Sequence, residues 1–278
     1  RPAHSRSGVL WDKAVLPVAP ANGGAGDYFE YWCADGGLTQ AWNPDAAVTG
    51  DQYVVAKWSP IFDAAALVTV PGATALQMMT EDGVSWAGFT HTVSSFRIGK
   101  FEVTYGLWHQ VHTWATNNGY TFAKHGCEGH DGTEGAAVTV ASNEPVTKIG
   151  WRDAIVWCNA YSAKKGLTRV YYSDSGFTTA LVDSTAAASC DAAFVNWAAS
   201  GYRLPTEGQW QLAAGYLNAT TVTTNTWASG ATGDYSNSDA VKAVSWYNGN
   251  AGNVTKTVGT KRANRLGIYD MSGNVWEY

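Results

Sequence analysis

The chain has 278 residues, of which 45% are hydrophobic, so it can bury a sizeable core in one large domain and a small one. Only 15% of the residues are charged, whereas 30 are glycine and 14 are tryptophan, a profile that favours a loop-rich, β-containing extracellular domain over a helical cytosolic enzyme. The net charge of −5 and the lack of a Lys/Arg run argue against nucleic acid as a partner, and no hydrophobic run approaches the roughly eighteen residues of a membrane span.

The first sixty residues read as a small, separate β module. Strand-like runs at Tyr28–Trp32 and Gln52–Trp58 are divided by Asp-Gly-Gly and Thr-Gly-Asp turns. The segment resembles the Listeria–Bacteroides repeat, a β-grasp module of bacterial surface proteins, in its Tyr-Trp pair, its Val-Thr-Gly-Asp turn and its closing Val-Ala-Lys-Trp. That resemblance implies a spacer on the exterior of a bacterial cell.

Residues 96–108 predict a strand, because apolar residues alternate, and then a helix that Thr104 opens. His109 and His112 would share one face of that helix. A Gly-rich insertion follows that gathers His125, Cys127, Glu128, His130 and Asp131. Because these spacings match no zinc pattern, a surface loop and exposed or partly satisfied histidines are the favoured interpretation.

The segment 145–166 predicts a second helix, on which Cys158 is expected to be a small buried hydrophobe. Four cysteines are compatible with one or two disulfides but do not require them. Cys127 and Cys190 both lie in loop-like insertions, so they are the expected pair, which leaves Cys33 and Cys158 unpaired.

Thr206 and Gln209 form a capping box that predicts a short helix and a structural corner. The stretch 217–240 is rich in Thr, Asn, Ser and Gly and predicts a long exposed loop. Binding function commonly resides in such loops when they stand on a rigid scaffold.

The last twelve residues, GIYDMSGNVWEY, predict a turn at Ser-Gly-Asn followed by the start of an aromatic strand at Val275. Hard cations take carboxylate, amide and carbonyl oxygens from one tight turn. The side chains of Asn274 and Glu277, with the carbonyls near Ser272 and Val275, could supply such a set. A plain hydrogen-bonded turn is the alternative.

Residues from about 95 to 278 resemble the formylglycine-generating enzyme (sulfatase-modifying factor) family. The resemblance rests on four motifs in the family's order: FRIGKFEVTYGLW, PVTKIGWRDAIVWCNAYSAKKG, GYRLPTEGQW and GIYDMSGNVWEY. It implies an α+β fold of the C-type-lectin type, with a few helices, twisted antiparallel strands and little regular secondary structure. Core packing is expected for most of the motif tryptophans, which are Trp108, Trp151, Trp157, Trp210 and Trp276.

The resemblance also implies structural calcium at the last motif, held by Ser272, Asn274, Val275 and Glu277. A second calcium is a weaker expectation, because the corresponding stretch WYNGNAGN matches the family poorly and offers only Asn248 and Asn250.

The expected organisation is a β module at residues 1–59, a linker or joining strand at 60–75, and a C-terminally incomplete family domain at 76–278. The oxidases of this family use a copper-binding cysteine pair placed after the GNVWE motif. All the cysteines of this chain lie before that motif, so no catalytic residue can be assigned.

Three functions follow from these features. The first is a ligand-binding protein of the bacterial surface, of the kind varied by diversity-generating retroelements, whose binding segment lies around and beyond the end of the chain. Its partner would be a protein or another cell-surface ligand. The second is a copper-dependent formylglycine-generating oxidase that modifies sulfatase cysteines. The third is a structural adhesin domain that needs only packing and calcium.

Overall fold

The computed structural model describes residues 27–33, 55–60, 66–79, 85–218, 221–223 and 226–278. The chain divides into two compact units, residues 1–61 and 62–278. In the first unit, β1 (Asp27–Cys33) pairs antiparallel with β2 (Val55–Pro60), and a bulge interrupts the ladder between Phe29 and Tyr31. Both strands coincide with runs predicted from the sequence. The rest of the expected β-grasp-like module lies outside the described residues.

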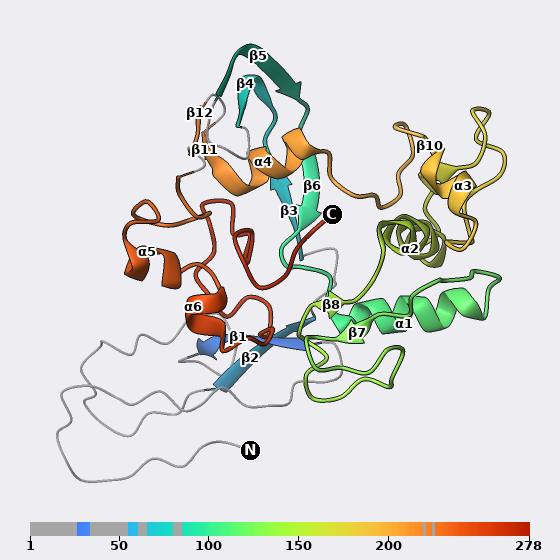
Figure 1. The fold of residues 1–278 in the computed structure, drawn as a ribbon, viewed down its shortest axis with the longest axis horizontal. Helices are drawn as coiled ribbons and strands as arrows, with labels where there is room; N and C mark the ends of the chain where they lie inside the picture. Colours follow the sequence, from blue (N-terminus) through green and yellow to red (C-terminus); the bar gives the residue numbers. More distant parts are fainter. Residues whose placement is uncertain (1–26, 34–54, 61–65, 80–84, 219–220, 224–225) are drawn as a thin grey trace. The chain divides into compact units, whose positions relative to one another are not determined.

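The second unit is an α+β fold in which short two-stranded antiparallel ribbons and helices are joined by long loops (Figure 1). Its helices are α1 (Tyr105–Thr116), α2 (Trp151–Lys164), α3 (Ala187–Asp191), α4 (Glu207–Gly215), α5 (Ser238–Lys242) and α6 (Asn248–Ala251). Its ribbons pair β3 (Leu67–Val70) with β6 (Phe96–Gly99), β4 (Ala73–Met79) with β5 (Ser85–Val93), β7 (Cys127–Glu128) with β8 (Val146–Thr147), β9 (Tyr171–Tyr172) with β10 (Phe194–Val195), and β11 (Tyr216–Asn218) with β12 (Thr221–Val222). The predicted fold class and the low content of regular structure are confirmed.

Residues 67–70 fell within the expected linker, which the sequence left open as a joining strand. In the structure they form β3, which runs antiparallel to β6 with Val70 opposite Phe96. Val70 is fully buried, because it packs in a core that also contains Leu212 and Ile268. This stretch is therefore an integral strand of the second unit.

The larger core lies between α1 and α2. The rings of Trp108 and Trp157 stack in parallel with their centroids 5.5 Å apart, and both are almost completely buried. A buried carboxylate of α2 fastens loops to this core. The carboxylate of Asp153 accepts hydrogen bonds from the backbone N–H groups of Gly150, Ala123 and Lys124 and from the hydroxyl of Ser184.

Cys127, Cys158 and Cys190 are buried free thiols, so the structure does not contain the Cys127–Cys190 disulfide expected from the sequence. The two residues belong to different surroundings. Cys127 begins β7, whereas Cys190 lies on α3 within the α1–α2 core and donates its Sγ–H to the carbonyl of Asp183. Burial stabilises both positions without a covalent link, as is usual for small apolar side chains.

The second core joins α4 to the β3–β6 ribbon and to the last segment of the chain. Thr206 caps α4 by accepting from the N–H of Gln209, whose side chain accepts from the N–H of Thr206, so the predicted capping box is confirmed. Ile268 and Met271 close this core. As a result, the C-terminal residues run between α4 and the α1–α2 pair (Figure 1).

Candidate functional site

A groove of about 670 Å³ lies where the C-terminal segment crosses the second unit. Its walls are mostly apolar. The α1–α2 pair contributes Leu107 and Trp157, and the opposite wall contains Trp210 and Met271. The groove is therefore built by residues that lie far apart in the sequence, from Ala66 to Tyr278, and that the fold of the second unit brings together.

Two aromatic side chains of the last segment stand at this groove. Trp276 is fully exposed and Tyr278 is 54% exposed. The segment is tethered by its neighbours: the hydroxyl of Tyr278 donates to the carbonyl of Ile149, and Trp210 Nε1 donates to the carboxylate of Glu277 at 2.7 Å.

Core packing was expected for most of the motif tryptophans. Trp108 and Trp157 are buried and Trp210 packs against the second core, whereas Trp151 is 39% exposed and Trp276 is fully exposed. The strand predicted from Val275 onwards does not form. Its Trp276 therefore has no sheet face to pack against. An exposed tryptophan beside an apolar groove is a feature of binding surfaces.

Three carboxylates interact beneath the groove. Asp270 is 3% exposed, and its Oδ2 accepts from the N–H of Gly259 while its Oδ1 has no hydrogen-bond partner. Burial raises the pKa of Asp270 to about 6. Burial, and then the charges of Asp270 and Glu277, hold the pKa of Glu102 well above its usual range. Among the described residues, Lys261 is the cation whose charge lowers the pKa of Asp270, so three interacting carboxyl groups share one nearby cation.

The predicted calcium ligands lie on one turn but engage different partners. Asn274 is held by Glu102, which accepts from its Nδ2 at 2.7 Å, and by Lys256, whose N–H donates to its Oδ1. The N–H of Val275 also donates to Glu102. Ser272 Oγ accepts from the N–H of Ser229, away from that contact. The structure thus brings Asn274 and Val275 together on Glu102 and directs Ser272 elsewhere.

Asp270 is the residue that sequence reasoning missed. Its unpartnered oxygen is a buried carboxylate donor at the start of the turn, and oxygen donors of this kind suit a hard cation. Its φ of +59° and the φ of +70° at Asn274 fold the turn back on itself. The available signal was an acidic residue placed between apolar Ile268 and Met271, which are both buried in the structure.

The weaker candidates have structural roles. Asn250 caps α6, because its Oδ1 accepts from the N–H of Tyr247 and its Nδ2 donates to the carbonyl of Ser245. Asn248 is the first residue of that helix. Within the described ranges, no three His, Cys, Asp or Glu side chains converge closely enough to hold a metal ion. A cation at the 270–277 turn would therefore depend on one or two carboxylates and on carbonyl oxygens.

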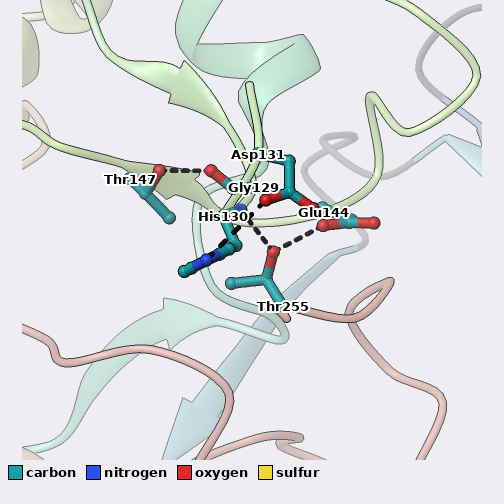
Figure 2. Close-up of polar contacts among 6 residues, drawn as sticks. All are labelled: Gly129, His130, Asp131, Glu144, Thr147 and Thr255. Carbon is teal, nitrogen blue, oxygen red and sulfur yellow. Dashed lines mark hydrogen bonds and ion pairs between the residues drawn. The ribbon is translucent and has the colours of Figure 1, made fainter. Parts of the chain in front are cut away.

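The Gly-rich insertion is clamped to the body of the unit beside the groove (Figure 2). The N–H of His130 donates to Thr255 Oγ1 at 2.7 Å, and that hydroxyl donates to Glu144. Gly129, with a φ of +57°, passes so close that a Cβ would collide with the Glu144 carboxylate. Thr147 Oγ1 donates to the carbonyl of Gly129. These contacts fix the loop and place His130 at the groove.

Comparison with known proteins agrees with this architecture. The family described as "Sulfatase-modifying factor enzyme 1-like domain" matches residues 54–278. Chaperone protein LppX of Paenibacillus barcinonensis is 34% identical over 205 residues, which cover 67% of this chain and 62% of LppX. The chain thus spans less than two thirds of the length of that relative.

Two solved structures are also similar. The crystal structure of CarF shares 28% identity with a TM-score of 0.59, over 75% of this chain and 77% of CarF. Treponema denticola variable protein 1 shares 26% identity with a TM-score of 0.54, over 84% of this chain and 74% of that protein.

Proposed function

We propose that this chain, which belongs to the sulfatase-modifying factor enzyme 1-like family, is a variable ligand-binding protein that uses a C-type-lectin-type domain as its scaffold. The similarity to Treponema denticola variable protein 1, at 26% identity, supports this class of function. The observation that carries the proposal is the apolar groove with Trp276 and Tyr278 exposed beside it. Tryptophan and tyrosine provide a large contact area at low cost in conformational entropy and dominate many binding interfaces.

The partner we propose is a protein or another ligand of a cell surface, bound while this protein is displayed on the exterior of a bacterial cell. The resemblance of the first unit to a surface spacer supports that location. Among the described residues, no helix has the length and apolar character needed to cross a membrane. The mostly apolar groove favours partners that insert an apolar side chain or a short apolar segment.

Calcium is proposed as a structural cofactor of the 270–277 turn. Asp270 supports the proposal with its unpartnered buried oxygen, and Glu277 and the carbonyls near Ser272 and Val275 complete an oxygen-rich donor set. We assign Asn274 mainly a structural role, because its side chain donates a hydrogen bond to Glu102. The cation would offset the surplus negative charge and so hold the segment that presents Trp276.

The oxidase alternative would place its copper on a cysteine pair that follows the GNVWE motif. Cys158 precedes that motif, and burial in the α1–α2 core raises its pKa to about 12, as expected for a structural thiol. The adhesin alternative differs from ours in one respect, because it assigns no role to the groove. Under that alternative, substitution of a groove residue would not change the affinity for any ligand.

The test is affinity selection from a phage-displayed random peptide library on the full chain, followed by titration of enriched peptides against variants. Trp276→Ala should weaken binding at least tenfold. Trp227→Ala is the matched control, because Trp227 is 39% exposed and does not line the groove, and it should leave the affinity unchanged. Failure to enrich any peptide, or equal loss in both variants, would contradict the proposal.

A further inference from the structure

Two histidine-containing features that gave no site in the sequence meet in the structure. His112 comes from α1, and His125 comes from the start of the Gly-rich insertion. Nε2 of His112 lies 3.0 Å from Nδ1 of His125, and the two rings are nearly perpendicular. Neither stretch of sequence has the residue spacing of a metal-binding motif. The fold nevertheless brings the imidazole of His112 and the imidazole of His125 close enough for both to bind one ion.

The backbone of His125 and the ring of His112 are held in place by their surroundings. The backbone of His125 is fixed on two sides, because its N–H donates to the Glu134 carboxylate and its carbonyl accepts from Trp108 Nε1 at 2.8 Å. Trp108 is 1% exposed and belongs to the main core, so it anchors this loop firmly. The ring of His112 packs against Phe122 with the centroids 4.7 Å apart. Because these groups are anchored, an ion that replaces the hydrogen bond would have to order little more than the turn of the two rings towards it.

The separation of the two nitrogens selects among metals. Two metal–imidazole bonds of about 2.1 Å that end on nitrogens 3.0 Å apart enclose an angle of about 90°. That angle is typical of neighbouring ligands in square-planar, tetragonal and octahedral coordination, which Cu²⁺ and Ni²⁺ prefer in nitrogen-rich sites. A tetrahedral ion would need the nitrogens about 3.4 Å apart for bonds of the same length.

We propose that His112 and His125 chelate a divalent transition ion, Cu²⁺ or Ni²⁺, at the junction of α1 and the Gly-rich insertion. His125 is exposed, so the ion can enter from solvent and complete its coordination with water. In the present hydrogen bond one of the two imidazoles is the donor. On chelation that ring moves its proton to its other nitrogen, so the step needs no net release of a proton from a neutral pair.

The surroundings agree with this assignment. The carboxylate of Glu134 lies beside the His125 backbone and favours positive charge nearby. The ion would link the insertion to α1 and thereby stiffen the loop that places His130 at the groove.

The experiment is calorimetric titration of the untagged full chain with CuCl₂, NiCl₂ and ZnCl₂, each followed by a thermal melt. We expect binding of one Cu²⁺ per chain, an order of affinity Cu²⁺ > Ni²⁺ > Zn²⁺, and a higher melting temperature with Cu²⁺. His112→Gln and His125→Gln should each lower the Cu²⁺ affinity at least tenfold. His130→Gln is the control and should change it by less than twofold. Electron paramagnetic resonance should show two coordinated imidazole nitrogens that are reduced to one in each pair variant.

Adventitious binding would give the opposite result. If His112→Gln and His125→Gln both bind Cu²⁺ within threefold of the unsubstituted chain, or if His130→Gln weakens binding equally, the proposal is overturned. Because His112 is half-buried, its variant could fail to fold; His125 is exposed, so His125→Gln provides the decisive comparison in that case. Circular dichroism without metal establishes that each variant used is folded.

Discussion

Asn159 shows how single buried polar residues shape a protein with so little regular structure. Its side chain is fully buried, donates to the carbonyls of Tyr171 and Leu181, and accepts from the N–H groups of Val170 and Tyr171. Tyr171 begins β9, and Val170 and Leu181 lie beside that strand, so one buried amide braces the edge of the short β9–β10 ribbon. Such a role depends on residues 11 to 22 positions away and cannot be predicted from local sequence patterns.

We therefore expect Asn159→Ala to be strongly destabilising. The change leaves several buried backbone groups unpaired, each at a cost of about 1–3 kcal/mol, so the free energy of unfolding should fall by about 3 kcal/mol or more. Urea denaturation followed by circular dichroism measures the loss. Asn118→Ala is the control, because Asn118 is exposed and bonds only the carbonyl of Trp114, and it should stay within about 0.5 kcal/mol of the unsubstituted chain.

Asp270 should make stability depend on pH in the absence of a bound cation. Its folded pKa of about 6 exceeds its ordinary value of 3.8, so the folded state binds more protons between those values. The contribution of Asp270 to stability is thus present at low pH and is lost as pH rises through about 6, by up to about 3 kcal/mol.

Asp270→Asn should reduce this dependence, leaving the part due to Glu102 and Glu277, and raise the melting temperature at pH 8 in a chelator, where the unsubstituted chain buries an ionised carboxylate. Melting curves at pH 5 and pH 8 in EDTA provide the measurement. A variant that is less stable than the unsubstituted chain at pH 8 would show that the ionised carboxylate of Asp270 does not destabilise the fold at that pH.

At the scale of elements, the helices were the most predictable part of the fold because their signals are local. Thr104 and Thr206 each cap the helix that follows, as the sequence indicates, and each accepts from a backbone N–H three residues on. The strand expected from Val275 was wrong because a strand needs a partner, which no local pattern supplies. The strand at 67–70 was left open between two interpretations for the same reason: its partner, β6, lies some thirty residues further along the chain.

Thr206→Ala should cost about 1 kcal/mol, because it removes the hydroxyl that caps α4 and half of the capping box. The loss should appear as a lower free energy of unfolding with little change in the m-value. Thr116→Ala removes a hydroxyl at the exposed end of α1 and should have a smaller effect. An equal effect of the two changes would mean that the cap contributes no specific stability.

At the scale of the whole molecule, the candidate site could be predicted only in part. The sequence located the 270–277 turn and the residues near the end of the chain, because the family motif is contiguous. It could not predict the groove, whose walls come from α1, α2, α4 and the last segment, or the convergence of Glu102 with Asp270 across 168 positions. It expected most of the motif tryptophans in the core and could not single out Trp276 as an exception, since nothing local distinguishes a buried aromatic residue from one exposed beside a groove.

Calcium should stabilise the whole second unit if it binds at the 270–277 turn. Adding CaCl₂ at one hundred times its dissociation constant contributes about 2.7 kcal/mol to folding, which is a rise of several degrees in melting temperature. Asp270→Asn should lose most of this rise, and Mg²⁺ should not reproduce it, because it is smaller and demands strict octahedral geometry. A melting temperature that is the same in CaCl₂ and in EDTA would exclude the site.

The most direct test of the binding account is amide hydrogen exchange of the full chain, with and without a peptide enriched by affinity selection. We predict new protection at residues 202–212 and 266–278, which border the groove, and unchanged exchange in α5 and in the 226–237 loop. Protection confined to the 226–237 loop, or none at 266–278, would contradict the claim that this protein binds its ligand through the groove at Trp276.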